Sequence, residues 1–418
     1  MAIFNHIGRG NEIIGALDIG TGKVCCIIAA RDQGQSVLLG IGHQRARGLK
    51  SGMVIDPDEA ERSIRAAVGQ AERMAGVTLD RITVSVSCGR VRSASFVARA
   101  EVEGSVVREH DVDRILGAGE AYLERSGRTV IQLMRSDWRL DGASGIADPR
   151  GLAGRQLAID LTAVTADDGP LRNLLGIIER SHMVADRVVA SGYAAAMAVT
   201  TDDERRLGTL VVEMGAGVTS LAAFIEGRLV YLDTIPIGGN HVTYDLAREL
   251  VTTVQEAERI KTLYGTLVRA ASNDGEIFAY TLTGEDEGTA HQVSKAFVRE
   301  VIKPRIDGLI DIVAERVGEA RLGEHIGRRI VLTGGASQLL GLDQVWGQRF
   351  GAMVRIGRPQ PIGRMLMSMC TPAFSTVLGL VGIGSQPQPG SGALIGIDGR
   401  RRDLGYIDRM HRWIRESF

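Results

Sequence analysis

The stretch NEIIGALDIGTGKVCCIIAA, residues 11–30, decides the fold. Two apolar runs rich in β-branched residues flank the turn Gly20-Thr21-Gly22, and this pattern predicts a buried β-hairpin over residues 13–17 and 24–30. A plain hairpin needs no carboxylate, yet Asp18 ends the first run. A turn of small residues exposes backbone N–H groups that bind phosphate oxygens, and a nearby carboxylate can hold Mg²⁺ through water. A single copy would more often be an ordinary turn with a solvated aspartate.

The same pattern returns in the second half of the chain, at residues 207–239, LGTLVVEMGAGVTSLAAFIEGRLVYLDTIPIGG. An apolar run ends near Glu213, the turn Gly215-Ala216-Gly217 follows, and a second apolar run begins. A third predicted strand, within residues 328–342, leads into Thr333-Gly334-Gly335. The repetition indicates a duplicated fold in which two hairpins clamp the phosphates of a nucleotide from both sides.

Composition and spacing exclude several other classes of protein. The chain of 418 residues is 44% apolar and 24% charged, which predicts about two to four globular domains. Its net charge of -1 argues against a nucleic-acid binder. None of the four cysteines forms a C-x-x-C pair, so we expect buried thiols and no zinc site. Gly22-Lys23 is followed by Val24, and no G-x-G-x-x-G occurs in either turn, so neither a Walker A loop nor a dinucleotide fingerprint is supported.

The remaining pattern predicts helices and strands around these hairpins. At about residues 90–165 it predicts an inserted module of short alternating strands around one helix. Asp56-Pro57 caps a predicted helix over residues 58–74. Inside the module we expect strands at 93–102, 129–140 and 157–164, a helix at 111–126 and a loop at 142–154. Beyond it we expect a strand at 187–190, helices at 170–181, 193–199, 242–250, 254–263 and 293–317, and a polar stretch at 273–288.

The glycine turns resemble a known superfamily. GALDIGTGKV, VVEMGAGVT and VLTGGASQLLGL are similar to the two phosphate motifs and the adenosine motif of the actin/Hsp70/sugar-kinase superfamily. More narrowly, nearly the whole chain resembles the FtsA family of actin-like bacterial cell-division proteins. The stretches that carry this narrower resemblance, in the same order, are TTDDERRLGTLVVEMGAGVTSLAAFIEGRLV, IPIGGNHVTYDLAREL, EAERIKTLYG and PAFSTVLGLVGIG.

The resemblance implies an α/β fold of duplicated actin-like (RNase H-like) halves around a nucleotide cleft. It implies an inserted α+β domain, 1C, at residues 85–162. It assigns residues 1–84, 163–198 and 370–384 to subdomain 1A, 199–231 and 306–369 to 2A, and 232–305 to 2B. We interpret residues 385–399 as a flexible linker and 400–418 as an amphipathic helix.

The resemblance also implies that ATP and Mg²⁺ bind at the glycine turns. The matching positions are Asp18, Gly20, Thr21, Gly22, Lys23, Glu213, Gly215, Gly217, Thr219, Gly238, Gly239, Glu258, Lys261, Gly334, Gly335 and Ala336. Asp18 and Glu213 are the candidates for holding the metal. Glu258 and Lys261 lie three residues apart, on one helical face, and would reach the ribose and base, although such a pair alone would more often be a surface salt bridge.

Two departures from the family pattern concern hydrolysis. Glu213 stands where the second phosphate motif usually has Asp, and Ser191 stands where relatives have the Gln or Glu that orients the attacking water. Because hydrolysis needs that water held in line, we expect ATP binding with weak or absent ATPase activity.

The last predicted helix has one apolar and one charged side. Its apolar half is formed by Leu404, Tyr406, Ile407, Met410, Trp413, Ile414 and Phe418. Arginines such as Arg412 would meet anionic headgroups while Leu404, Ile407, Met410, Trp413, Ile414 and Phe418 enter the bilayer interface. The alternative is a helix that packs on its own domain, but the preceding linker and the family resemblance both favour the membrane.

The resemblance implies an adaptor that self-associates head-to-tail and recruits the tubulin-like protein FtsZ by its C-terminal peptide. It would sit peripherally on the cytoplasmic face of the membrane at the division site, with other division proteins. Arg299, Lys303 and Arg305 on the long predicted helix are candidates for contacting an acidic peptide, although such helices are usually only solvated. The alternatives are a soluble actin-fold ATPase or kinase and a pilus-assembly relative of the FtsA family.

Overall fold

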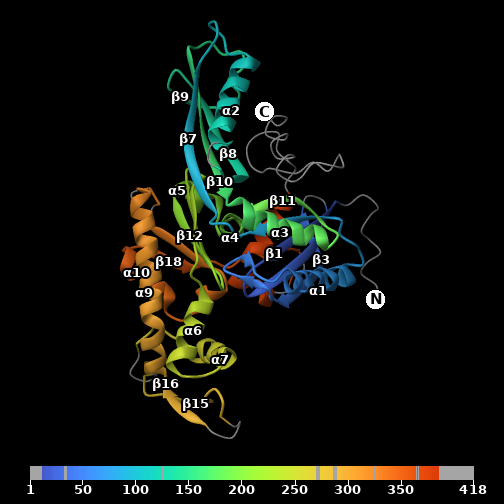
Figure 1. Ribbon diagram of the computed structural model, residues 1–418. Helices are drawn as coiled ribbons and strands as arrows, with labels where there is room; N and C mark the ends of the chain where they lie inside the picture. Colours follow the sequence, from blue (N-terminus) through green and yellow to red (C-terminus); the bar gives the residue numbers. More distant parts are fainter. Residues whose placement is uncertain are drawn as a thin grey trace.

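The computed structural model describes residues 12–32, 35–124, 127–269, 274–285, 290–323, 325–326, 328–363, 365 and 367–385. It shows an elongated molecule with a central body of two sheets (Figure 1). A module around α2 extends from one end of this body, and α6, α7 and β15 lie at the opposite end. The predicted linker and terminal helix, beyond Ser385, lie outside the described residues.

The first half is built on a five-stranded sheet with the order β11-β6-β1-β2-β3. β1 (Ile13–Ile19), β2 (Lys23–Asp32) and β3 (Gln35–Arg45) form an antiparallel meander. β6 (Arg81–Val86) and β11 (Val184–Ala190) are parallel to β1. The hairpin predicted from residues 13–30 is therefore the centre of this sheet.

The second half repeats this topology. Read from its opposite edge, its strand order is β18-β17-β12-β13-β14, which matches β11-β6-β1-β2-β3 strand for strand. β12 (Thr209–Met214), β13 (Thr219–Ile225) and β14 (Arg228–Ile235) form the antiparallel meander. β17 (Arg329–Thr333) and β18 (Met353–Ile356) continue the sheet in parallel. The same strand order in both sheets confirms the predicted duplication.

Helices pack on both sheets. The helices are α1 (Pro57–Ala75), α3 (Asp168–Arg180), α4 (Ser191–Val199), α5 (Asp202–Leu207), α6 (Gly239–Glu249), α7 (Val254–Tyr264), α9 (Lys295–Glu319), α10 (Leu342–Phe350) and α11 (Ser375–Gly384). The side chain of Asp56 caps α1 by accepting from Asp58 N and Glu59 N, as the sequence predicts. α4 and α11 are buried along nearly their whole length, since they lie against each other at the centre of the molecule. α6 and α7 lie beyond the second sheet, against α9.

The inserted module is a four-stranded antiparallel sheet with one helix. Its strands follow the order β7-β10-β8-β9, and they comprise β7 (Arg92–Glu101), β8 (Thr129–Leu140), β9 (Ala143–Ile146) and β10 (Gln156–Ala166). α2 (Glu109–Glu124) packs against β7 and β10. The predicted loop over residues 142–154 is wrong in part, because β9 occupies its first residues and pairs with β8.

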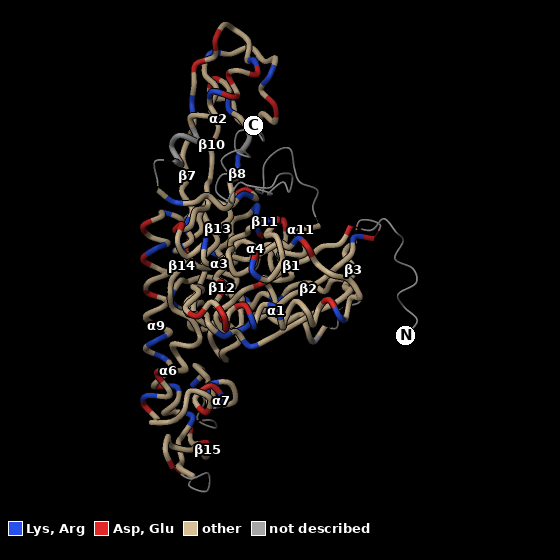
Figure 2. Tube along the Cα trace, turned by 45° about the vertical axis from the view of Figure 1, so that its right-hand side comes forward, with Lys and Arg blue, Asp and Glu red and all other residues tan. Residues whose placement is uncertain are grey.

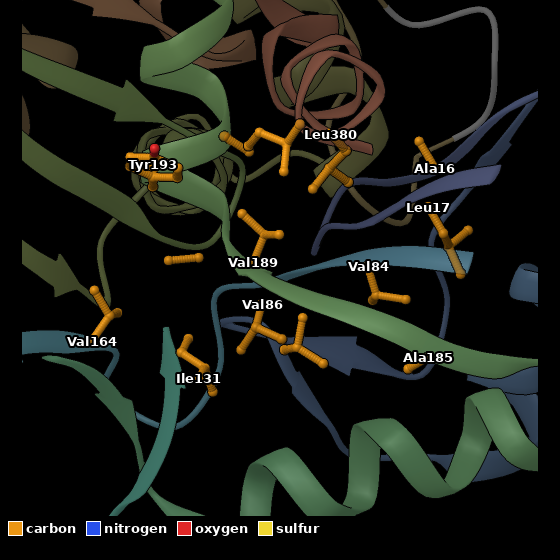
Figure 3. Packing of buried hydrophobic residues seen from close by; sticks show 14 of the residues in the cluster. Ala16, Leu17, Val84, Val86, Ile131, Val164, Ala185, Val189, Tyr193 and Leu380 are labelled. Carbon is orange, nitrogen blue, oxygen red and sulfur yellow. The ribbon is translucent and has the colours of Figure 1, made fainter. Parts of the chain in front are cut away.

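The module contacts both halves. Figure 3 shows Ile131 of the module beside Val86 of the first sheet, and Val164 belongs to the same buried cluster. Toward the second half, the edge strand β7 runs along the edge strand β14. Leu232 N donates to Ser93 Oγ (2.7 Å), and Thr234 Oγ1 donates to Val91 O (3.0 Å). Side-chain hydroxyls therefore join the two sheets edge to edge.

Two short hairpins complete the fold. β4 (Leu49–Lys50) and β5 (Met53–Val54) pair beside the first glycine turn. β15 (Ile277–Tyr280) and β16 (His291–Ser294) pair at the outer end of the second half. β15 lies within the predicted polar stretch, where no strand was expected. Among the described helices, none combines the length and hydropathy needed to cross a membrane.

Candidate nucleotide-binding site

The two phosphate turns have the same local geometry. Gly20 N donates to Lys23 O (3.0 Å) in the first turn, and Gly215 N donates to Val218 O (2.9 Å) in the second. Each turn follows a central strand of its own sheet, β1 or β12. The duplicated topology therefore presents two equivalent turns of small residues.

The two turns touch each other. A Cβ added to Gly22 would lie 2.8 Å from Ala216 Cβ, and one added to Gly217 would lie 2.6 Å from Thr21 Oγ1. Both distances are below any normal contact, so only glycine fits at these positions. The Thr21 hydroxyl also accepts from Gly52 N (2.9 Å) in the β4–β5 hairpin. The predicted positions Gly20 to Lys23 and Gly215 to Thr219 are thus brought together.

The predicted positions Gly238 and Gly239 join the second turn. Gly239 N donates to Gly215 O (2.9 Å), and Asn240 N donates to Ala216 O (2.8 Å), at the start of α6. Ala336, after the third glycine turn, lies against Gly239. The third turn is itself held by a hydrogen bond from Gly334 N to Pro372 O (3.1 Å). Glycine turns from three sequence-distant segments therefore converge.

Asp18 and Lys23 lie beside the first turn. Ser85 Oγ, on the neighbouring strand β6, donates to Asp18 Oδ1 (2.8 Å), and Ile19 N donates to the same Ser85 hydroxyl (3.2 Å). Lys23 Nζ lies 3.6 Å from Asp18 Oδ2. This ammonium is inaccessible to solvent and has no hydrogen-bond acceptor among the described residues. A buried ammonium with free donors fits an anionic ligand, because leaving such donors unmet is unfavourable.

Glu213 occupies the equivalent place in the second half. Ser220 Oγ donates to Glu213 Oε2 (3.1 Å). Burial first, and the nearby charge of Asp18 second, raise the pKa of Glu213 to about 7. Ser191 is buried at the start of α4, with its hydroxyl 3.4 Å from that of Ser220. The position that would orient a water therefore carries a short hydroxyl in place of an amide or carboxylate.

Glu258 and Lys261 form a linked cluster with Thr243. Lys261 Nζ donates to Glu258 Oε2 (2.7 Å), Thr243 Oγ1 (2.8 Å) and Gly239 O (3.2 Å). Thr243 Oγ1 lies within hydrogen-bond distance (2.6 Å) of Glu258 Oε2. The pair predicted on α7 thus contacts α6 at Gly239, next to the third turn, rather than standing alone on the surface.

The candidate partner-binding cations lie elsewhere, on α9, and each has an acidic partner. Arg299 pairs with Asp274, Lys303 with Asp307, and Arg305 with Asp245 (2.7 Å). The Arg299 side chain is 9% exposed, whereas those of Lys303 and Arg305 are 44% and 36% exposed. Figure 2 shows basic and acidic residues alternating along α9. The candidate membrane residues, Leu404 to Phe418, lie outside the described residues.

Sequence reasoning missed four residues of the site: Ser85, Ser220, Thr243 and Phe374, whose ring centroid lies 4.7 Å from Lys23 Nζ. Thr243 could have been found, because it stands four residues after Gly239 and therefore on the same helical face. Ser85 and Phe374 carry no such signal, since each reaches the site from a distant segment.

The donor set suits Mg²⁺ bound partly through water. Among the described residues, no three His, Cys, Asp or Glu side chains cluster as a metal cage. Asp18 and Glu213 supply two carboxylates, and Mg²⁺ commonly binds to one or two carboxylates together with ligand phosphates and waters. The site thus fits Mg²⁺ that arrives with a phosphate ligand.

A duplicated α/β fold whose glycine turns meet between the halves defines an actin-like protein. Solved structures agree: a chain of the PilM-PilN type IV pilus biogenesis complex superposes with a TM-score of 0.63 at 16% identity, over 90% of this chain and 99% of that chain. MreB5 of Spiroplasma citri bound to ADP gives 0.51 at 13% identity, over 89% and 95%. These likenesses concern the fold.

Sequence comparison identifies the family within the actin-like proteins. The family model "Cell division protein FtsA" matches residues 210–379, and "SHS2 domain inserted in FTSA" matches residues 88–165. The cell division protein FtsA of Agrobacterium fabrum (strain C58) is 35% identical, over 98% of this chain and 96% of its own. That of Escherichia coli K12 is 26% identical, over 97% and 98%. The chain belongs to the FtsA family of cell division proteins.

Proposed function

We propose that this cell division protein binds ATP with Mg²⁺ between its two halves and links the FtsZ ring to the membrane. The observation that carries the nucleotide proposal is the contact between the two glycine turns, with the Lys23 ammonium beside them, buried and without a hydrogen-bond acceptor among the described residues. The solved relative MreB5, which has the same fold, is bound to ADP.

In this proposal, different residues of the chain bind the phosphates, the metal, the ribose and the base. The N–H groups of Gly20 and Gly215 close the two turns, and those of residues 21–22 and 216–217, together with Lys23, bind the phosphates. Asp18, with Glu213, holds the Mg²⁺, which would neutralise phosphate charge. Glu258 and Lys261 contact the ribose and base, and residues 334–336 pack on the adenosine.

We further propose that ATP hydrolysis is slow or absent. An attacking water must be held in line with the terminal phosphate. The short hydroxyl of Ser191 faces Ser220 at 3.4 Å.

The adaptor part of the proposal rests on the family and on the sequence of the tail. The protein would self-associate head-to-tail, and its terminal residues 400–418 would bind anionic lipids on the cytoplasmic face of the membrane. FtsZ would dock by its acidic C-terminal peptide. Lys303 and Arg305 are exposed enough to exchange their present carboxylate partners for those of a peptide, whereas Arg299 is buried.

Two measurements on the full-length protein test the proposal. Calorimetry should detect ATP binding in the presence of Mg²⁺. Lys23→Met should weaken this binding, and the matched control Lys50→Met, at an exposed position, should not. Absence of binding by the unmodified protein would reject the nucleotide proposal.

Co-sedimentation with liposomes containing anionic lipid tests the adaptor. The full chain should pellet with the vesicles, and a version ending at Gly399 should stay in solution. If both stay in solution with and without ATP, the adaptor proposal fails and a soluble actin-fold ATPase or kinase is the better account.

A further inference from the structure

The segment 372–375 passes between the halves and contacts both. Pro372 O accepts from Gly334 N (3.1 Å), and Ser375 Oγ lies 2.7 Å from Thr333 Oγ1. Both hydrogen bonds join the segment to the third glycine turn, in the second half. Between these anchors, the ring of Phe374 lies beneath Lys23 Nζ, 4.7 Å from ring centroid to nitrogen, in the first half. The ring is thus fixed by one half and contacts the other.

Lys23 has little else to fix its position. Its distance of 3.6 Å to Asp18 Oδ2 is longer than a hydrogen bond, and no other acceptor contacts Nζ among the described residues. A lysine stem has several rotatable bonds, so an ammonium without hydrogen bonds would ordinarily sample several positions. The face of an aromatic ring attracts a cation within about 6 Å, and the attraction grows when water is excluded.

The neighbouring side chains leave the ring available to Lys23. The imidazole of His43 lies 5.7 Å from the Phe374 ring, tilted by 59°. Partial burial, and then the charge of Lys23, lower the pKa of His43, so this histidine is neutral at neutral pH. No second cation therefore competes for the ring from that side.

We propose that Phe374 is a positioning residue that holds the Lys23 ammonium at the first phosphate turn by a cation–π contact. This inference rests on the proposed nucleotide function. With the ring in place, Lys23 presents its free donors to a phosphate without first losing conformational freedom, and affinity gains from such preorganisation. The competing explanation is that Phe374 only fills space against the core of the first half, where it is partly buried.

The first test measures the affinity of the full-length protein for ATP, ADP and adenosine. Phe374→Leu should weaken ATP binding about fivefold, since a cation–π contact contributes on the order of 1 kcal/mol. Adenosine affinity should not change, and Phe374→Tyr should restore ATP binding. Phe374→Met serves as a second variant without a ring if the leucine variant folds poorly. The matched control is Phe350→Leu, a partly buried phenylalanine that stacks on Trp346 away from the turns.

A double-mutant cycle then separates positioning from packing. In a Lys23→Met background, Phe374→Leu should cause no further loss of ATP affinity. The inference is overturned if the loss is the same in both backgrounds, or if adenosine and ATP lose affinity by the same factor.

A second test needs no nucleotide, so it stands even if ATP does not bind. The chain has only five lysines: Lys23, Lys50, Lys261, Lys295 and Lys303. Acetylation followed by peptide mapping should find Lys23 protected in the natural protein and labelled several-fold faster in Phe374→Leu, with Lys50 unchanged. Equal Lys23 labelling in both proteins would show that the ring does not hold the ammonium.

Discussion

Thr21 of the first half lies so close to Gly217 of the second that a Cβ at Gly217 would be 2.6 Å from the threonine hydroxyl. The two phosphate turns therefore approach each other to the limit that a glycine allows. Because the same hydroxyl accepts from Gly52 N, it has little freedom to move aside.

Gly217→Ala should separate the turns and weaken ATP binding at least about tenfold, because one ligand could no longer contact both turns with good geometry. Calorimetry with ATP and Mg²⁺ gives the affinity. The matched control is Gly308→Ala in α9, where an added Cβ meets nothing and helix propensity should raise stability by up to about 1 kcal/mol. Unchanged ATP affinity in Gly217→Ala would refute the two-turn site.

Thr243→Val should weaken the binding of ATP, ADP and adenosine by the same factor, about fivefold. The hydroxyl lies within hydrogen-bond distance of Glu258 and Lys261, and its loss leaves that cluster without one of its partners. A common factor for all three ligands places the defect at the ribose and base. A loss confined to ATP would instead assign this cluster to the phosphates.

Glu213 should make the free energy of unfolding fall as pH rises from about 4.5 to about 7 in nucleotide-free, metal-free protein. Its pKa rises from 4.5 to about 7 on folding, so between these values the unfolded chain loses a proton that the folded chain keeps. The shift corresponds to about 3 kcal/mol at most. Glu213→Gln should therefore be more stable than the natural chain at pH 8, and by much less at pH 5.

Thermal unfolding at the two pH values measures this difference. Glu319→Gln, at an exposed position, is the control and should not alter the pH dependence. An equal gain for Glu213→Gln at both pH values would contradict a raised pKa.

Arg299→Ala should destabilise the fold by about 2 kcal/mol, because it removes a buried guanidinium that pairs with Asp274 and donates to Val268 O. Lys303→Ala should be nearly neutral, since its pair with Asp307 is exposed. Urea unfolding measures both. In peptide-binding assays, Lys303→Ala or Arg305→Ala should weaken the binding of an acidic FtsZ peptide. A loss seen only with Arg299→Ala would indicate unfolding of the region.

The elements that could be predicted are those with strong local patterns. The repeated hairpins carry their apolar runs and glycine turns within about twenty residues each, and Asp56-Pro57 is a complete local signal for the start of α1. The duplicated sheet order follows from that repetition. The same local pattern predicts the glycine turns.

The elements that were missed depend on contacts between distant segments. β9 and β15 are four-residue strands whose pairing partners, rather than their own residues, make them strands. Phe374 appears in sequence as one more apolar residue, and only the fold brings it beneath Lys23. The ion pairs of α9 likewise involve Asp245 and Asp274, which no helical spacing could indicate.

The edge-to-edge contact between β7 and β14 has a mechanical consequence. The inserted module is covalently part of the first half, yet Ser93 and Val91 hydrogen-bond to the second. A rotation of one half against the other must shear these bonds or carry the module with it. Because the module extends far from this contact (Figure 1), it would act as a lever arm whose outer tip moves farther than its base at β7 and β14.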